Sequence, residues 1–122
     1  MACSLRSPNE VCEVFEDTAV VAHVAWTLYP INDVIVINKA TAAIGDTAVF
    51  YYFIPKVVVD CVAITSGNLA DFAEGSKVYY DDATNAVTNV ANANVCGFVT
   101  VAPSVGDTTV EIHFDGTLRI VA

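Results

Sequence analysis

Basic residues are scarce in this chain of 122 residues. Lysine and arginine number 5 against 14 aspartates and glutamates, which gives a net charge of −9. The five basic residues are spread along the sequence: Arg6, Lys39, Lys56, Lys77 and Arg119. Nucleic acids and anionic membranes are both bound by clustered lysine and arginine. We therefore expect neither nucleic acid nor a membrane as a partner, whereas a basic protein surface stays compatible with the composition.

Recognisable catalytic and cofactor motifs are also missing. The chain contains no Gly-x-Ser-x-Gly, no His-Glu-x-x-His and no phosphate-binding glycine loop. Glu111 and His113 fall on one face of a strand-like segment and are conceivable as an acid–base pair. Ordinary polar alternation on a strand surface explains them more simply. The prediction is that the protein is not an enzyme and carries no cofactor.

Metal-ligand spacing is absent as well. The four cysteines form no CxxC pair and fit no zinc motif: Cys3, Cys12, Cys61 and Cys96. Cys61 and Cys96 lie in apolar runs, where we expect small buried side chains. The Asp-Asp-Ala-Thr-Asn segment at 81–85 is conceivable as a calcium site, but it lacks the ligand spacing of an EF-hand loop, so a hairpin turn is the preferred interpretation.

No apolar stretch is long enough to span a bilayer, and residues 1–10 lack the apolar core of a signal peptide. We therefore expect the chain to be made in a reducing cytoplasm. Leucine occurs only 4 times, whereas valine, isoleucine and threonine together number 40. Branching at Cβ suits a pleated sheet and disfavours a helix. The composition predicts an all-β fold, with an N-terminal arm at 1–10 and a single β domain at 11–122.

A motif occurs twice in the chain. Gly-Asp-Thr-x-Val-x-x-x-Phe is found at 45–53 and again at 106–114, each time after an apolar run. In the second copy Val110, Ile112 and Phe114 alternate with polar residues, which predicts a strand with one buried face. The sequence therefore predicts two related hairpins and some internal symmetry.

Apolar and β-branched runs define the other expected elements. We predict strands at 11–15, 19–29, 34–38, 47–54, 57–64, 76–80, 86–88 and 117–121. Breaks are expected at 16–18, at the turn 30–33 and at Pro55-Lys56, and a single helical turn is expected within 69–74. His23 lies within an apolar run and is interpreted as a packed histidine. Asp60 is unusual in the run Val-Val-Val-Asp-Cys; pairing with Lys56 or a neighbouring chain, or a bulge, would each account for it.

Several residues are candidates for contact with a partner. The arm is either a frayed terminus or a segment that orders on a partner, through Ser4, Leu5 and Arg6. The near-continuous apolar run that contains Val57 and Val59 requires burial on both faces, by a second sheet or by another subunit. Aromatic residues anchor interfaces and stack on sugars. That chemistry makes the following residues candidates: Trp26, Tyr51 and Tyr52.

An ordered set of short motifs resembles one protein family. Gly75-Ser76-Lys77-Val78-Tyr79-Tyr80-Asp81 is followed by Val87-Thr88, Cys96-Gly97 and the strand Gly106-Asp107-Thr108-Thr109-Val110-Glu111-Ile112. The Gly45-Asp46 turn and Phe53-Ile54-Pro55-Lys56 precede them. This order, over about residues 34–116, resembles the small capsid decoration, or cement, proteins of tailed phages.

The resemblance implies a small β-barrel or β-sandwich built from antiparallel hairpins, placed on the outer surface of a virion that assembles in the host cytoplasm. Its expected partners are the major capsid protein and further copies of itself, as a homotrimer. The expected function is to stabilise contacts between capsid subunits. The alternative is a soluble β-sandwich module that binds a glycan or a protein ligand through its aromatic residues.

Overall fold

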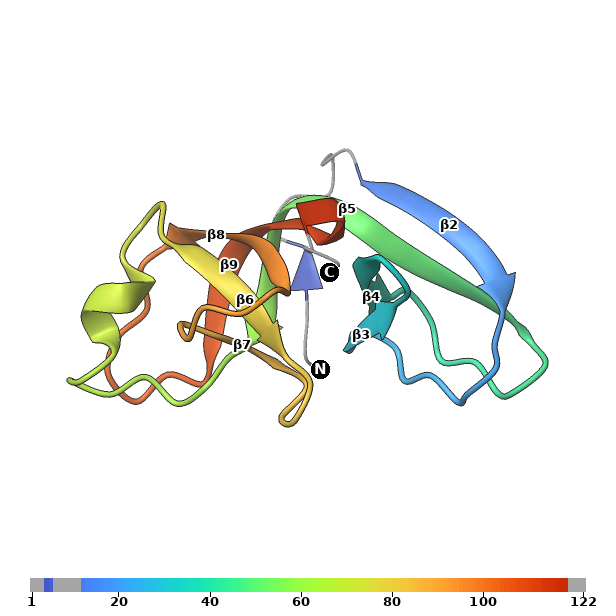
Figure 1. The fold of residues 1–122 in the computed structure, drawn as a ribbon, viewed down its shortest axis with the longest axis horizontal. Helices are drawn as coiled ribbons and strands as arrows, with labels where there is room; N and C mark the ends of the chain where they lie inside the picture. Colours follow the sequence, from blue (N-terminus) through green and yellow to red (C-terminus); the bar gives the residue numbers. More distant parts are fainter. Residues whose placement is uncertain (1–3, 6–11, 119–122) are drawn as a thin grey trace.

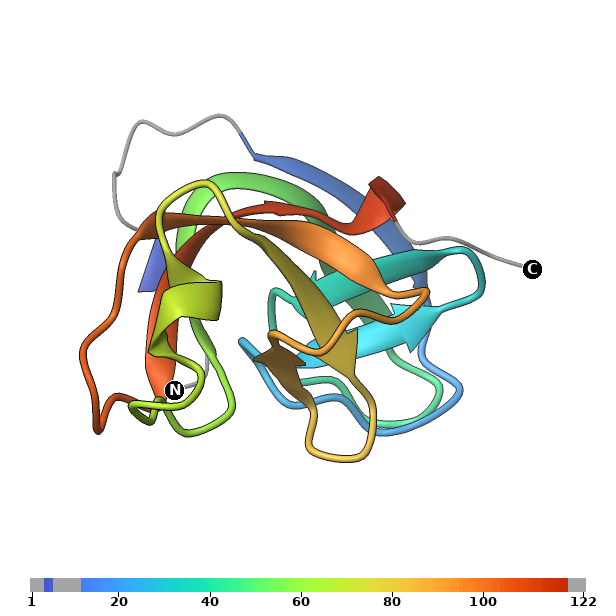
Figure 2. The same cartoon turned by 60° about the vertical axis from the view of Figure 1, so that its left-hand side comes forward.

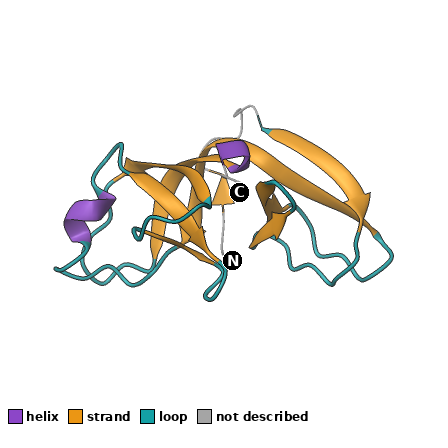
Figure 3. Ribbon diagram, viewed as in Figure 1, coloured by secondary structure: helices purple, strands orange, loops and turns teal. Residues whose placement is uncertain are grey.

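The computed structural model describes residues 4–5 and 12–118. Strands dominate it, which confirms the all-β prediction (Figure 3). Within this described part the helices are two short 3-10 turns, and neither is long enough to cross a membrane. The elements in chain order are β1 (Ser4–Leu5), β2 (Glu13–Thr18), β3 (Leu28–Ile31), β4 (Val34–Asn38), β5 (Thr47–Asp60), η1 (Leu69–Phe72), β6 (Lys77–Asp81), β7 (Ala86–Thr88), β8 (Val95–Val101), β9 (Thr109–Asp115) and η2 (Gly116–Leu118).

Strand β5 organises the sheet. Seven strands follow the order β3-β4-β5-β9-β8-β6-β7, and β1 and β2 also pair with β5. Figure 1 shows β5 running from the β2–β4–β3 part of the molecule into the part formed by β6 to β9. The predicted interruption of the ladder at Pro55-Lys56 is confirmed, because the register with β9 shifts between Ile54 and Val57, although β5 itself continues through both residues. Such a bulge accepts a proline that has no N–H to donate.

The sheet curls into a nearly closed antiparallel β-barrel, so the barrel is the correct one of the two expected forms. A parallel bridge between Cys61 and Val87 brings the end of β5 to β7, and the Val62 N–H donates to the Val87 carbonyl at 2.9 Å. The alternation predicted for β9 is confirmed, because Val110, Ile112 and Phe114 are all buried. Buried residues of β4 and of the barrel strands form one continuous core.

The repeated motif forms the same turn twice. Gly45 and Gly106 have φ values of 92° and 97°, a region that glycine enters without steric cost. The aspartate that follows each glycine then accepts a hydrogen bond from the backbone three residues before it. Ala43 N–H donates to Asp46 Oδ2 at 3.2 Å, and Ser104 N–H donates to Asp107 Oδ2 at 2.9 Å. The predicted symmetry is therefore seen in the two turns, which have the same geometry. The strands that follow these turns, β5 and β9, pair with each other.

Three other predictions from the sequence are corrected. Residues 16–18 continue β2, and their exposed polar side chains fit an outer strand of the sheet. The predicted strand 19–29 is mostly a loop, and regular pairing begins at Leu28. Residues 117 and 118 lie in the short helix η2, where a strand was expected; the remainder of the predicted strand falls outside the described residues. Periodicity failed at 19–29 and 117–118 because short apolar runs fit loop, strand and helix alike, and at 16–18 because a polar segment can still pair at the outside of a sheet.

Two buried thiols give stability a dependence on alkaline pH. Burial raises the pKa of Cys96 to about 12, and burial followed by the carboxylates of Asp107 and Asp60 raises the pKa of Cys61 to about 11. The unfolded chain ionises its thiols near pH 9.0. The native state therefore retains protons that the unfolded state loses, so this stability is complete below pH 9 and is lost as pH rises through the raised values.

We expect the urea midpoint of unfolding to fall steadily between pH 9 and 11. Cys96→Ala removes one of the two thiols, so its midpoint should fall less steeply over the same range, whatever its value at pH 8. The measurement is urea denaturation followed by circular dichroism at half-unit pH steps. Equal slopes for the two proteins would show that ionisation of Cys96 makes no contribution.

Candidate functional site

Two loops, residues 19–27 and 39–46, lie next to the β2–β4–β3 part of the molecule and are joined by backbone hydrogen bonds. We call these two loops the tip. Their backbones bond to one another at both positions of a bridge: His23 N–H donates to the Ala42 carbonyl at 2.9 Å, and Ala42 N–H donates to the His23 carbonyl at 3.1 Å. Ala19 N–H donates to the Asp46 carbonyl at 2.8 Å. Figure 2 shows the two loops running side by side beyond β4 and β5. The tip is therefore a connected unit rather than two independent loops.

The tip exposes apolar side chains. Val20 is 78% exposed, Val24 is 62% exposed and Ile44 is 70% exposed. Scattered exposed valines are ordinary on protein surfaces, but here three exposed apolar side chains lie on two loops that bond to each other, and we call these three residues the apolar patch. Such a patch is typical of a surface that another protein covers.

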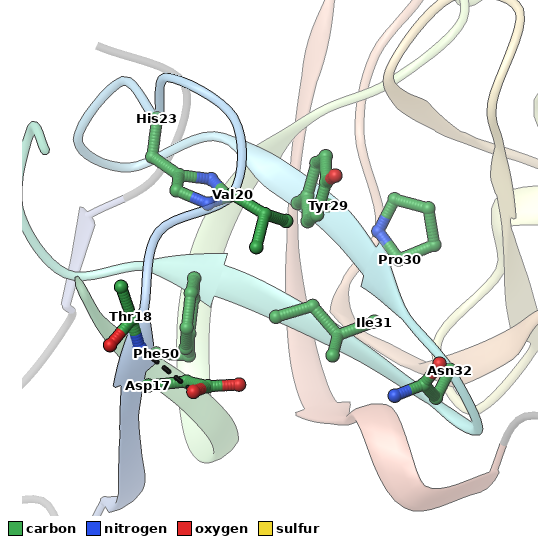
Figure 4. A pocket seen from close by; sticks show the side chains of 9 residues that line it. All are labelled: Asp17, Thr18, Val20, His23, Tyr29, Pro30, Ile31, Asn32 and Phe50. Atoms are coloured by element: carbon green, nitrogen blue, oxygen red, sulfur yellow. Dashed lines mark hydrogen bonds between the residues drawn. The ribbon is translucent and has the colours of Figure 1, made fainter. Parts of the chain in front are cut away.

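A cleft of about 320 Å³ opens beside this patch (Figure 4). Its walls come from β2, from the first loop of the tip, from β3 and from the Phe50 side chain of β5. The residues around it are Asp17, Thr18, Val20, His23, Tyr29, Pro30, Ile31, Asn32 and Phe50. The side chain of Asp17 is on the same face of β2 as Phe15, which packs on Phe50 at a centroid distance of 5.2 Å. The cleft therefore combines an aromatic floor with one carboxylate at its edge.

His23 is the buried polar residue of the cleft. Its ring lies edge-on to Tyr29 and to Phe50, at centroid distances of 4.8 and 5.1 Å, and only 4% of the residue is exposed. This packing agrees with the prediction of a packed histidine. Figure 4 shows both ring nitrogens on the side of the imidazole nearer Tyr29. Nδ1 has no hydrogen-bond partner among the described residues.

The structure brings two of the predicted aromatic residues together. Trp26 stacks on Tyr51 at a centroid distance of 5.5 Å and an interplanar angle of 25°, and Lys39 Nζ lies 5.8 Å from the centre of the Tyr51 ring. Burial, and to a smaller extent the thiol of Cys12, raises the pKa of Tyr51. Trp26 has a φ of 64°, which is strained for a bulky residue, and its N–H donates to the Asn38 carbonyl at 2.6 Å. Both rings therefore serve the core.

The other predicted interface residues differ in their burial and contacts. Val57 and Val59 have zero exposure, which corrects their assignment to an interface: the barrel's own strands bury this run, and no second subunit is required. Tyr51 is also buried, so its assignment to an interface is corrected as well. Tyr52 is half-buried, with its ring 6.1 Å from that of Phe15, and stays a prediction. The backbones of Ser4 and Leu5 pair with Val58 and Val57, and Arg6 lies outside the described residues.

Glu111 and His113 each have another neighbour. Glu111 Oε1 accepts a hydrogen bond from Thr100 Oγ1 at 3.0 Å. The ring of His113 stacks on Phe98 at 4.8 Å and meets Phe53 edge-on at 5.2 Å. This arrangement is an aromatic row on the barrel's outer surface, with Phe98 its most exposed member.

The 81–85 segment is a turn closed by its own side chains. Asp81 accepts hydrogen bonds from Ala83 N–H at 3.0 Å and from Thr84 Oγ1 at 3.2 Å. Among the described residues there is no group of three or more His, Cys, Asp or Glu side chains placed to hold a metal ion. The preferred interpretation of this segment as a hairpin turn is confirmed.

Comparison with known proteins finds no protein-family model, curated protein or solved structure that matches this chain. The candidate site is therefore defined by geometry alone. Sequence reasoning does not identify Val20, Val24 and Ile44 as a site, because it assigns no role to the short segment before Gly45 and predicts a strand in the apolar run at 19–29. A signal was nevertheless present, since the alanines and valines of that run show no strict alternation.

Proposed function

We propose that the protein is a capsid decoration protein, which binds the outer surface of a phage head and stabilises contacts between major capsid protein subunits. The observation that carries this proposal is the exposed apolar tip at one end of an acidic β-barrel. The order of short motifs over residues 34–116 supports it independently, through the resemblance to decoration proteins. The tip and its cleft are the surface that we assign to the capsid.

The physical chemistry of the tip supports a docking role. Fully burying an exposed valine or isoleucine contributes about 1.5–3 kcal/mol, so Val20, Val24 and Ile44 together offer a useful but modest binding energy. A modest energy suffices on a shell, because many copies act at once and each bound copy stabilises a contact. The net charge of −9 further favours a partner with a basic surface.

Self-association into a homotrimer is part of the same proposal. A cyclic trimer is held by two different patches of each subunit. The aromatic row of Phe53, His113 and Phe98 provides an outer patch on the barrel, distinct from the tip. Light scattering of the pure protein decides between monomer and trimer.

The alternative of a glycan-binding module has less support from the predicted aromatic residues. It relied on Trp26, Tyr51 or Tyr52 as an exposed stacking surface. Tyr51 is buried and Trp26 stacks on it, whereas Tyr52 is half-buried and stays a candidate. No other observation favours that function over capsid binding.

Head binding is the direct test. We expect the purified protein to co-sediment with expanded heads from which decoration protein has been removed, and to saturate them at micromolar concentration. The same protein with unexpanded proheads serves as the control for nonspecific adsorption. Absence of binding to expanded heads at micromolar protein would contradict the proposal.

A further inference from the structure

A second cavity, which we call the inner pocket, lies between the tip and the β6–β7 turn. Its volume is about 390 Å³. Three features that the sequence singles out separately meet here: His23, Asp60 at the end of β5, and the 81–85 turn through Thr84 and Asn85. The remaining wall residues are Ala22, Val24, Thr27, Leu28, Tyr29 and Asn38.

Two buried side chains of the inner pocket each have a polar atom without a partner. Within the described part of the chain, His23 Nδ1 and Asn38 Oδ1 are the buried atoms of this kind, and Asn38 is only 2% exposed. An unpaired buried polar atom destabilises the fold. Both residues line this cavity, so a ligand that donates hydrogen bonds to them, after a small rotation of each side chain, would remove both penalties.

The orientation of the Asn38 amide is fixed by its neighbour. Thr27 Oγ1 donates its single proton to the Val24 carbonyl at 2.7 Å. It must therefore accept from Asn38 at 2.8 Å, which places Nδ2 at Thr27 and leaves Oδ1 as the unpaired atom. The inner pocket thus presents an acceptor, and a neutral imidazole can present a second acceptor at His23 Nδ1.

Asp60 supplies the charge. It is half-buried, and no described residue donates a hydrogen bond or an ion pair to its carboxylate. Among the described residues that line the pocket, Asp60 is the only acidic one, and none of them is a lysine or an arginine. A cation beside this carboxylate gains a Coulomb attraction that a neutral polyol does not.

We propose that the inner pocket binds a guanidinium or primary ammonium group on a short apolar stem. The cationic N–H groups donate to Asp60, Asn38 Oδ1 and His23 Nδ1, while Leu28, Tyr29 and Val24 flank the stem. The unpaired atoms of this pocket are acceptors and its charged residue is anionic, so a cation that only donates hydrogen bonds fits better than a sugar, whose oxygens also require donors. The cation can be a free amine or the side chain of an arginine or lysine in a partner protein. The proposal needs no capsid and stands apart from the assigned function.

The test uses titrations of ¹⁵N-labelled protein followed by NMR. Agmatine represents a free guanidinium, N-acetyl-Gly-Arg-Gly-amide represents a protein side chain, and the matching citrulline peptide is its neutral isostere. We expect saturable shifts of the side-chain amides of Asn38 and Asn85 with at least one guanidinium probe, and affinity at least tenfold weaker for citrulline. Binding of agmatine alone identifies a small-molecule site; binding of the arginine peptide shows that a protein side chain also fits.

Two variants complete the test. Asp60→Asn should weaken binding at least tenfold, whereas Asp82→Asn removes the same charge from an exposed residue of the neighbouring turn and should leave the affinity unchanged. Dispersed spectra confirm that both variants are folded. Equal affinity for citrulline and arginine, no saturable binding of either guanidinium probe, or shifts confined to another surface would each overturn the proposal without bearing on head binding.

Discussion

Gly116→Ala is expected to lower the free energy of unfolding by more than about 4 kcal/mol, which is a large part of the 5–15 kcal/mol typical of a folded domain. Gly116 is buried where β9 ends and η2 begins. A Cβ atom there would overlap the carbonyl oxygen of Ile35, and it would lie 2.7 Å from the carbonyl carbon of the same residue. Both obstacles are backbone atoms of β4, so no side-chain rotation relieves the clash.

The structural consequence reaches beyond one contact. Strands β4 and β9 both pair with β5, β4 at Phe50 and Tyr51 and β9 from Phe53 onward. Glycine at 116 allows the end of β9 to lie directly against β4. Adding a methyl group forces these strands apart and disturbs the pairing of Ile54 with Phe114 in the core.

Chemical denaturation followed by circular dichroism measures this effect, and Gly67→Ala is the matched control. A Cβ at Gly67 would have its nearest neighbour, the Thr65 hydroxyl, at 3.6 Å, which is an ordinary van der Waals contact. The control should therefore change the unfolding free energy by less than about 1 kcal/mol. If the two variants are equally stable, the close approach of β9 to β4 is not a constraint on the fold.

Val20→Asp should weaken binding to expanded heads by about a hundredfold, corresponding to about 2.7 kcal/mol. The side chain is 78% exposed in the free protein, so the substitution should leave stability within about 0.5 kcal/mol of the original. In the complex the new carboxylate would lie in an apolar contact, where burying an unpaired charge is costly. Co-sedimentation over a range of protein concentrations gives the change in affinity.

The control for this substitution is Val90→Asp. Val90 is also a highly exposed valine, 65% accessible, and it lies in the connection between β7 and β8, outside the tip. The two variants have the same net charge, so general repulsion from the head affects both equally. Equal binding by Val20→Asp and Val90→Asp would show that the tip is not the docking surface, even if the protein does bind heads.

Local physical chemistry made much of the fold predictable. The strand 34–38 and the short strand 86–88 were placed at their observed bounds, because Val, Ile and Thr favour a pleated strand and polar turns delimit them. The helical turn was placed correctly around Leu69. The two Gly-Asp turns were predictable because glycine permits a positive φ and aspartate bonds to nearby backbone.

The candidate site was less accessible to sequence reasoning. An apolar run does not by itself indicate whether it is covered. Val57 was predicted to contact a partner although the barrel buries it, whereas Val20 was assigned no contact although the tip exposes it. His23 and Asp60 could each be noticed as unusual. Nothing in their spacing of 37 residues indicates that they line one cavity, because that depends on the tertiary packing of the tip beside the end of β5.

The sequence by itself determined the all-β class, the two matched turns and the acidic surface, because each follows from the preferences of residues close together in the chain. The tertiary structure decided which aromatic residues face inward, how the barrel closes at Cys61 and Val87, and which polar atoms are left without partners in the inner pocket. These outcomes depend on contacts between strands that are distant in the sequence, and the pattern within any one strand does not specify them.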